Sequence, residues 1–324
     1  MTVIGSDFDA ATAPFRRELV VHCYRMLGSV HEAEDLAQET LIRAWKARDR
    51  YDEQRASLRT WLYRIATNVC LTALEGRARR ALPSGLGTAS DDPHAPLVPD
   101  LAVPWLQPLP DRHLLRGDPL ARAVERDGVR LALVAAMQLL PPRQRAVLVL
   151  RDVLEFSAAE VAAQLGTSVA AVNSALQRAR AAVAGAAPRE DTLRDPDDPA
   201  VRDQVDRYVR AFEAADVDTL ITLLTDDAVL EMPPVPLWYA GRVDYGRFIA
   251  RVFAMRGTGW RMVPIAANGQ PAVAAYCPDD RGVLRLHTVQ VLTVTRRGIA
   301  HNVVFQDPQV FAAFDIALVL QRGR

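Results

Sequence analysis

Side chains that recognise nucleic-acid bases cluster near residue 175 of this 324-residue chain. Segment Ser157–Ala182 is interpreted as a first helix over Ala158–Leu165, a turn at Gly166 and a second helix with Ser168 as its N-cap. The residues expected to face inward are Ala159, Val161, Ala162, Leu165, Val172 and Leu176. Those left on the outer face of the second helix are Asn173, Ser174, Gln177, Arg178 and Arg180. Asn, Gln and Arg pair with base edges in the major groove, so the pattern favours a DNA-binding helix-turn-helix over a plain helical hairpin with a solvated face.

A second candidate for nucleic-acid contact is Ser57–Cys70, where aromatic residues alternate with arginines on one predicted helix. Aromatic faces stack on unpaired bases and arginines hold the phosphate backbone, a combination suited to single strands. Trp61 and Tyr63 cannot share one helix face, and Trp61 with Ile65 fits a buried core equally well. Tyr51, in the preceding loop, is the better candidate for an exposed stacking platform.

The formal net charge of zero hides an uneven distribution. Segment His31–Thr40 is acidic. The segment from Arg55 to Arg80 is basic, with six arginines and a single acidic residue, Glu75. An acidic patch followed by a basic one predicts two different partners on one small domain.

Composition limits the class of protein. With 50 % hydrophobic and 24 % charged residues, the chain can bury cores in about two or three domains, which excludes wholesale disorder. No apolar run approaches the ~20 residues of a membrane helix, and the N-terminus lacks a signal-peptide pattern. The cysteines Cys23, Cys70 and Cys277 lie far apart, and no metal-ligand spacing is present. We therefore expect a cytoplasmic protein with no membrane contact, no metal and no cofactor.

Proline content divides the chain. Three amphipathic helical segments precede residue 82, and residues 83–119 form a proline-rich linker. Helical periodicity returns over residues 120–186, and a short polar linker covers 187–198. Within the first linker, Val103–Asp111 (VPWLQPLPD) is too apolar for a solvated tether, so Trp105 and Leu106 are predicted to dock between domains.

Residues 199–324 differ from everything before them. A helix over Val201–Ala214 is followed by segments with a period of two at Gly269–Tyr276, Leu284–Thr295 and Ile299–Phe305, with a hairpin turn at Gly298. The predicted architecture is multidomain: two all-α domains followed by one α+β domain.

The helical half resembles an extracytoplasmic-function (ECF) sigma factor of bacterial RNA polymerase. EAEDLAQETLIRAW and LRTWLYRIATNVC resemble sigma region 2, and the segment from Leu140 to Arg180 resembles sigma region 4 with its helix-turn-helix. The resemblance covers residues ~10–185 and implies a factor that directs the polymerase to specific promoters and traps unstacked bases, while the polymerase supplies the chemistry. The implied partners are the β′ clamp helices and β flap of the core enzyme, and promoter DNA in duplex and melted form.

The resemblance also implies roles for individual residues. Those expected to bind the core polymerase are Asp35, Gln38 and Glu39. Those expected at the melted −10 element are Tyr51, Arg55, Ser57 and Asn68, with Arg77, Arg79 and Arg80 on the phosphate backbone. Those expected to read the −35 element are Asn173, Ser174, Gln177 and Arg178. Family members often carry arginine at the position of Asn173, so the base preference at −35 stays open.

The C-terminal region resembles the SnoaL-like α+β cone of polyketide cyclases and ketosteroid isomerases. The resemblance rests on Val205–Pro234 and on the predicted strands that follow it. Within Val205–Pro234 the sequence predicts a short helix, then an acidic turn, then a strand that ends at prolines. Such cones enclose an apolar pocket, where a carboxylate or a carboxylate–histidine pair does acid–base work in the enzymes. The candidates here are Asp244, His287 and His301. Where such a domain is attached to a sigma factor, the resemblance implies that it regulates the activity of that sigma factor in cis. A small molecule bound in the pocket of the domain is a further candidate partner.

Two other functions are compatible with parts of the sequence. One is a cyclase or isomerase with an attached DNA-binding module, which turnover of a lipophilic ketone would support. The other is a one-component repressor, which leaves the acidic helix and the Tyr51–Asn68 block unexplained. We therefore expect a non-enzymatic initiation factor.

Overall fold

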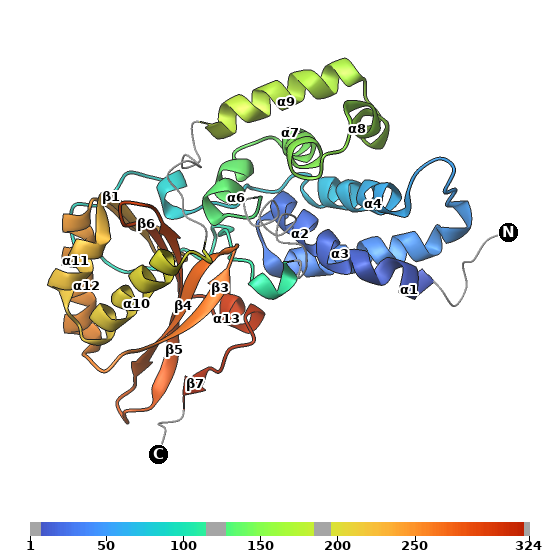
Figure 1. Cartoon of the computed structure of the whole chain (residues 1–324). Coiled ribbons are helices and arrows are strands. Elements are labelled where there is room, and N and C mark those ends of the chain that lie inside the picture. The colour runs from blue at the N-terminus through green and yellow to red at the C-terminus, as the bar shows by residue number, and fades with distance from the viewer. Residues whose placement is uncertain (1–7, 115–127, 185–195, 321–324) are drawn as a thin grey trace. The chain divides into compact units, whose positions relative to one another are not determined.

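The computed structural model describes residues 8–114, 128–184 and 196–320 (Figure 1). The chain divides into two compact units. The helical unit comprises Met1–Arg80 and Asp111–Ala187, and the mixed unit comprises Ala81–Pro110 and Pro188–Arg324. The two helical segments thus share one unit, and residues 81–110, called the strap below, belong to the mixed unit. The predicted start of the second helical domain at residue 120, and most of the linker at 187–198, lie outside the described residues.

The first half of the helical unit consists of short and long helices joined by tight turns. They are α1 (Phe8–Thr12), η1 (Ala13–Phe15), α2 (Arg16–Leu27), α3 (Val30–Lys46), η2 (Arg48–Arg50) and α4 (Leu58–Ala73). Gly28 ends α2 in the left-handed region at φ 71°, and the Ser29 side chain caps α3 by accepting from the Glu32 N–H. These local signals set where each helix begins and ends.

The second half of the helical unit contains η4 (Asp111–His113), α6 (Leu131–Gln138), α7 (Pro142–Leu148), the π-helical turn η5 (Val149–Val153), α8 (Ala158–Leu165) and α9 (Val169–Ala184). A capping box joins Ser157 and Glu160 at the start of α8, and Gly166 ends it at φ 61°. The Ser168 Oγ accepts from the Ala171 N–H at 3.1 Å. The predicted helix-turn-helix is confirmed, although Ala159, expected to face inward, is exposed on the first turn of α8.

Buried polar and aromatic contacts join the two halves of the helical unit. Arg145 of α7 is 2 % exposed and donates to the carbonyls of Met26, Gln138 and Leu140. The ring of Tyr63, on α4, meets that of Phe156 edge-on at 5.6 Å. Because separating the halves would leave these buried polar groups without their partners, the contacts favour one defined packing.

The mixed unit is built on one sheet in the order β2-β1-β6-β5-β4-β3, with β7 paired to β5. The strands are β1 (Leu224–Glu231), β2 (Trp238–Ala240), β3 (Arg261–Ala267), β4 (Gln270–Pro278), β5 (Leu284–Val294), β6 (Ile299–Phe305) and β7 (Val319–Leu320). Neighbouring strands are antiparallel except β1 and β6, which are parallel. Gly298 at the β5–β6 turn is required, since a Cβ there would lie 2.8 Å from the Leu223 carbonyl oxygen.

Three helices pack on this sheet: α10 (Pro199–Glu213), α11 (Val217–Leu223) and α12 (Arg242–Arg256), while α13 (Pro308–Ala313) follows β6 (Figure 1). Buried residues of these helices and the strands form one apolar core, which includes Phe212, Leu230 and Phe248. The predicted acidic turn after α11 is wrong, because Asp226 and Asp227 lie within β1, where both are exposed. Successive strand residues point to opposite faces, so two adjacent exposed residues mark an irregular stretch of β1, where its register with β6 shifts between Leu224 and Val229.

The strap is fixed along the mixed unit by hydrogen bonds. The strap's η3 (Pro83–Gly85) is anchored by the Ser84 N–H, which donates to Glu231 Oε2 at 2.7 Å. Further along, the Asp100 N–H donates to the Pro234 carbonyl at 2.9 Å. At the far end, Leu109 and Asn268 exchange two hydrogen bonds of 2.8 Å. The proline-rich segment is therefore a docked element of this unit.

Candidate nucleic-acid interface and cavity

The residues expected to bind the core polymerase share one side of α3. Asp35 and Gln38 are exposed, and Glu39 is half-buried. Their spacing of three and four residues makes them neighbours on the helix surface. Glu39 Oε1 accepts from Arg43 Nε at 2.7 Å, which leaves Asp35 as the more accessible carboxylate.

Tyr51 lies against the core instead of standing free as a stacking platform. It is half-buried, and its ring centroid is 5.0 Å from that of Trp61. Trp61 is 7 % exposed and belongs to the core, the alternative that its pairing with Ile65 favoured. One arginine of this segment turns inward, because the Arg59 guanidinium lies 4.9 Å from the Tyr63 ring and 5.0 Å from the Phe156 ring.

The other residues expected at the −10 element lie on the surface. Arg55, Ser57 and Asn68 are exposed. Ser57 also has a structural role, since its Oγ caps α4 by accepting from the Thr60 N–H at 3.1 Å. Asn68, more than two turns along α4, keeps its amide on the solvent side.

The acidic and basic segments meet at one carboxylate. Glu32 Oε1 lies 3.0 Å from both Arg77 Nη1 and Arg80 Nη2. Arg79 is exposed. Because exposed ion pairs are weak, Arg77 can exchange this carboxylate for a phosphate at little cost.

The four residues expected to read the −35 element share the exposed face of α9. Asn173, Ser174, Gln177 and Arg178 are all exposed, and Arg178 Nη1 donates to Ser174 Oγ at 2.7 Å. Arg180 is held by a bidentate pair with Asp152 at 2.8 Å for both bonds. Among the five outer residues predicted from the sequence, Arg180 is thus the one engaged in an ion pair within the described part of the chain.

Trp105 and Leu106 are buried within the strap. Trp105 is 9 % exposed and its Nε1 donates to the Asp100 carbonyl at 2.7 Å, while Leu106 is fully buried. The Leu106 N–H also donates to the Ala81 carbonyl at 3.0 Å. The motif therefore folds the strap back on itself.

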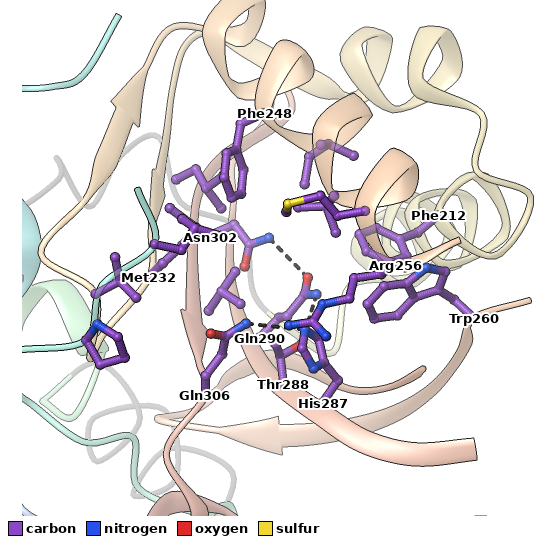
Figure 2. Close-up of a pocket in the computed structure, with 18 residues that line it drawn as sticks. Phe212, Met232, Phe248, Arg256, Trp260, His287, Thr288, Gln290, Asn302 and Gln306 are labelled. Atoms are coloured by element: carbon purple, nitrogen blue, oxygen red, sulfur yellow. Dashed lines mark hydrogen bonds between the residues drawn. The ribbon is translucent and has the colours of Figure 1, made fainter. Parts of the chain in front are cut away.

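A cavity of about 260 Å³ opens in the mixed unit between α10, α12 and the strands β1, β5 and β6 (Figure 2). Its wall is mainly apolar, and the strap contributes Leu97 and Pro99. At its inner end the Asn302 Nδ2 lies within hydrogen-bond distance of the Tyr208 and Tyr245 hydroxyls and of Gln290 Oε1, at 2.9–3.1 Å. Burial raises the pKa of both tyrosines, so this cluster is neutral.

Of the three predicted pocket residues, only His287 lines the cavity. Burial and the nearby Arg256 charge lower its pKa to about 4, so the imidazole is neutral at pH 7. The prediction is wrong for Asp244, which pairs with Arg247 at 3.4 Å, and for His301, whose Nε2 lies 2.8 Å from Glu231 Oε1. Glu231 and His301 therefore form a carboxylate–histidine pair outside the cavity. The Glu231 carboxylate of this pair is the group that accepts from Ser84 of the strap.

Glu231 is unusual as a buried carboxylate, being 1 % exposed. Burial alone would raise the pKa of Glu231, but hydrogen bonds from His301 and the Ser84 N–H outweigh it and leave that pKa below its usual value. Glu231 is thus charged when the strap is docked.

Comparison with known families identifies each part of the chain. Sigma-70 region 2 matches residues 13–80, Sigma-70 region 4 matches 130–183 and the SnoaL-like domain matches 205–310. The chain is 50 % identical over 314 residues to the ECF RNA polymerase sigma factor SigG of Mycobacterium tuberculosis, covering 96 % of this chain and 84 % of that protein.

This chain belongs to the ECF sigma factor family. It is also 34 % identical over 222 residues to SigJ of the same organism, covering 68 % of this chain and 62 % of SigJ. The crystal structure of SigJ has the same fold, with a TM-score of 0.66 at 24 % identity, covering 95 % of this chain and 99 % of that one. The activity of the family, promoter-specific initiation of transcription, is therefore assigned to this sigma factor.

The buried polar cluster beside the cavity of this sigma factor was not predicted from the sequence, and only its Gln290 and Asn302 line the cavity. Asn302, Gln290, Tyr208 and Tyr245 come from two strands and two helices, so no local motif contains them. The available signal was the occurrence of polar residues at inward positions of otherwise apolar strands.

Two further features of the sigma factor concern membranes and metals. Among the described residues, no helix is both long and apolar enough to cross a bilayer. Over the same residues, no three His, Cys, Asp or Glu side chains are grouped as metal ligands.

Proposed function

We propose that the helical unit binds the core polymerase through α3 and reads the promoter with α4 and α9. The exposed carboxylate of Asp35 suits basic residues of the β′ clamp helices. Asn68 and Arg55 are the accessible groups for melted −10 bases, and Asn173, Gln177 and Arg178 suit base edges of the −35 duplex. The β flap is the proposed partner of the second half of the unit.

The packing of the helical unit supports a closed, promoter-incompetent state. Positions −10 and −35 are separated by about 85 Å of B-DNA, taking 25 base pairs at about 3.4 Å each. The 16 residues of α9 span only about 24 Å, and α4 packs directly against α7 and α8. Both promoter elements cannot be bound at once in this packing, so the Tyr63–Phe156 and Arg145 contacts must open on the polymerase.

The strap supports regulation in cis. Residues 81–110 connect the two halves of the helical unit, yet Glu231, Pro234 and Asn268 of the mixed unit hold them by hydrogen bonds. A connector fixed at several points cannot extend freely. We infer that docking of the strap opposes opening of the helical unit, and that the cavity beside it is a ligand site.

The observation that carries this regulatory proposal is the two-bond exchange between Leu109 and Asn268, together with the Glu231 anchor. Its test is run-off transcription with purified core polymerase at a promoter selected by the holoenzyme. The proteins compared are the full chain, the 1–186 fragment and full-length Asn268→Gly. Glycine suits the φ of 58° at this position but lacks the amide oxygen that accepts from Leu109.

We expect both altered proteins to give more transcript than the full chain at equal polymerase concentration. Lower or unchanged transcription for both would contradict restraint by the strap. A failure of the full chain to co-purify with core polymerase would contradict the assignment of α3.

A further inference from the structure

The cavity of the mixed unit has an apolar body with polar groups at separate places. Apolar side chains such as Phe212, Leu230 and Phe248 form most of its wall. An apolar cavity of about 150 Å³ holds one benzene ring, so about 260 Å³ has room for one ring with a short substituent. No Asp or Glu lies in the lining, which disfavours a cationic occupant.

One buried acceptor in the cavity has no partner. Asn302 is 1 % exposed, and its Nδ2 is used by the tyrosine–glutamine cluster, but its Oδ1 has no hydrogen bond among the described residues. Figure 2 shows the Asn302 amide beside Gln290 at the cavity wall. A buried acceptor without a donor is costly, and a ligand hydroxyl would satisfy it.

One cation lies at the open side of the cavity. Arg256 lines it, is exposed, and has no carboxylate within 4 Å in the part of the chain that the structure describes. The neighbouring His287 is neutral at pH 7, and Gln306 Nε2 lies 3.3 Å from its Nε2. A carboxylate would therefore meet one full positive charge and neutral polar groups.

We propose that this cavity binds a hydroxylated aromatic carboxylic acid, whose carboxylate pairs with Arg256 and whose hydroxyl donates to Asn302 Oδ1. The apolar wall takes the ring between these two groups. This ligand class follows because the lining contains one exposed cation, Arg256, and one buried acceptor without a donor, Asn302 Oδ1. The lining that the structure describes contains no Asp or Glu.

The ligand also stabilises the docked strap, because Leu97 and Pro99 form part of the cavity wall. Their segment is tied to the mixed unit by Arg251, whose Nη1 donates to the Pro93 and Ala95 carbonyls at 2.8 Å. A ligand that contacts the strap only when it is docked shifts the equilibrium toward docking. This step rests on the proposed restraint of the helical unit, so the ligand is expected to act as a repressor.

The test of ligand class is calorimetric titration of the full chain with 3-(4-hydroxyphenyl)propionate, 3-phenylpropionate and 4-ethylphenol. We expect the hydroxy acid to bind at least tenfold more tightly than either probe lacking one polar group. Arg256→Gln should weaken the hydroxy acid at least tenfold, with little effect on 4-ethylphenol. Arg247→Gln, on the same helix but outside the cavity, should bind like the parent.

Absence of binding at millimolar probe, or equal affinity for the three probes, would overturn the proposal. Asn302→Leu, which lacks the Oδ1 acceptor, should bind the hydroxy acid no more tightly than 3-phenylpropionate. If this variant fails to fold, the affinity difference between the two acids in the parent chain still tests the hydroxyl contact.

The test of strap coupling is hydrogen exchange of the full chain without polymerase. We expect the hydroxy acid to slow exchange over residues 91–102 at least threefold, and unchanged exchange with bound probe would overturn the coupling. The transcription comparison of the preceding section uses no ligand, so failure there leaves these two measurements interpretable.

Discussion

The two units use polar side chains in opposite ways. In the helical unit the residues proposed to read DNA, such as Asn173 and Arg178, are exposed, while a separate buried arginine, Arg145, holds the packing. In the mixed unit Asn302 both completes the buried hydrogen-bond network and lines the cavity. On the proposed assignments, the α9 residues that read DNA are thus distinct from the arginine that holds the packing, whereas in the mixed unit Asn302 serves both purposes.

The largest effect that tests this contrast is expected from Arg145→Met. The substitution leaves the carbonyls of Met26, Gln138 and Leu140 without this donor, and at about 1–3 kcal/mol for each buried acceptor left unpaired the helical unit should lose roughly 3–5 kcal/mol of unfolding free energy. Because the units can unfold separately, the measurement is native-state hydrogen exchange on peptides of each unit. Arg143→Met, at an exposed position two residues earlier, is the control and should change stability by less than about 0.5 kcal/mol.

Asn302→Leu tests the second half of the contrast. It removes the Nδ2 donor from the Tyr208 and Tyr245 hydroxyls, so the mixed unit should lose roughly 1–3 kcal/mol. The same change at exposed Asn173 should leave the helical unit as stable as before. Equal losses at the two asparagines, measured by urea unfolding with unit-resolved hydrogen exchange, would break the distinction between the units.

The sequence predicted the helical unit well because its signals are local. Gly166 and Ser168 were predicted as turn and N-cap residues, whose effects extend over one helical turn, and the structure confirms both. Exposure of the α9 residues that are proposed to read the −35 element follows from helical periodicity alone. The Tyr51 orientation was less predictable, because it depends on contact with Trp61, ten residues later.

The mixed unit was less predictable at its cavity. The strand residues Glu231 and His301 are 70 positions apart and form a pair only because β1 and β6 run side by side in parallel. Because the sequence does not reveal which strands are neighbours, it gave no reason to prefer His287 over His301 or Asp244 as a pocket residue. Docking of the strap was also hidden, since its bonds to Pro234 and Asn268 are made mainly by backbone groups.

Acid should destabilise the helical unit through His22. Burial, with the charges of Arg25 and Arg59, lowers the pKa of His22 from 6.5 to about 3, so the folded state keeps it neutral. The unfolded chain binds a proton that the folded chain does not, and stability present above pH 6.5 is lost as pH falls toward 3. At pH 5.5 the loss is about 1.4 kcal/mol.

His22→Gln should flatten this pH dependence in the helical unit, as followed by urea unfolding between pH 7.5 and 5. His94→Gln, at an exposed position in the strap, should leave it in place. An unchanged slope in His22→Gln would mean that other groups dominate acid sensitivity.

The smallest effect is expected where recognition is separate from stability. Arg178→Ala removes one exposed guanidinium from the α9 face, so holoenzyme affinity for the −35 duplex should fall by roughly 1 kcal/mol, about fivefold. Unfolding free energy should stay within about 0.5 kcal/mol, because Arg178 bonds only to Ser174 among the described residues. Arg207→Ala, an exposed helical arginine of the mixed unit, should change neither quantity.

Holoenzyme binding to labelled promoter DNA, measured at two salt concentrations, separates a base contact from a phosphate contact, since loss of a phosphate contact also lowers the salt dependence. A loss of stability in Arg178→Ala equal to its loss of affinity would show that recognition and packing are coupled in the helical unit too.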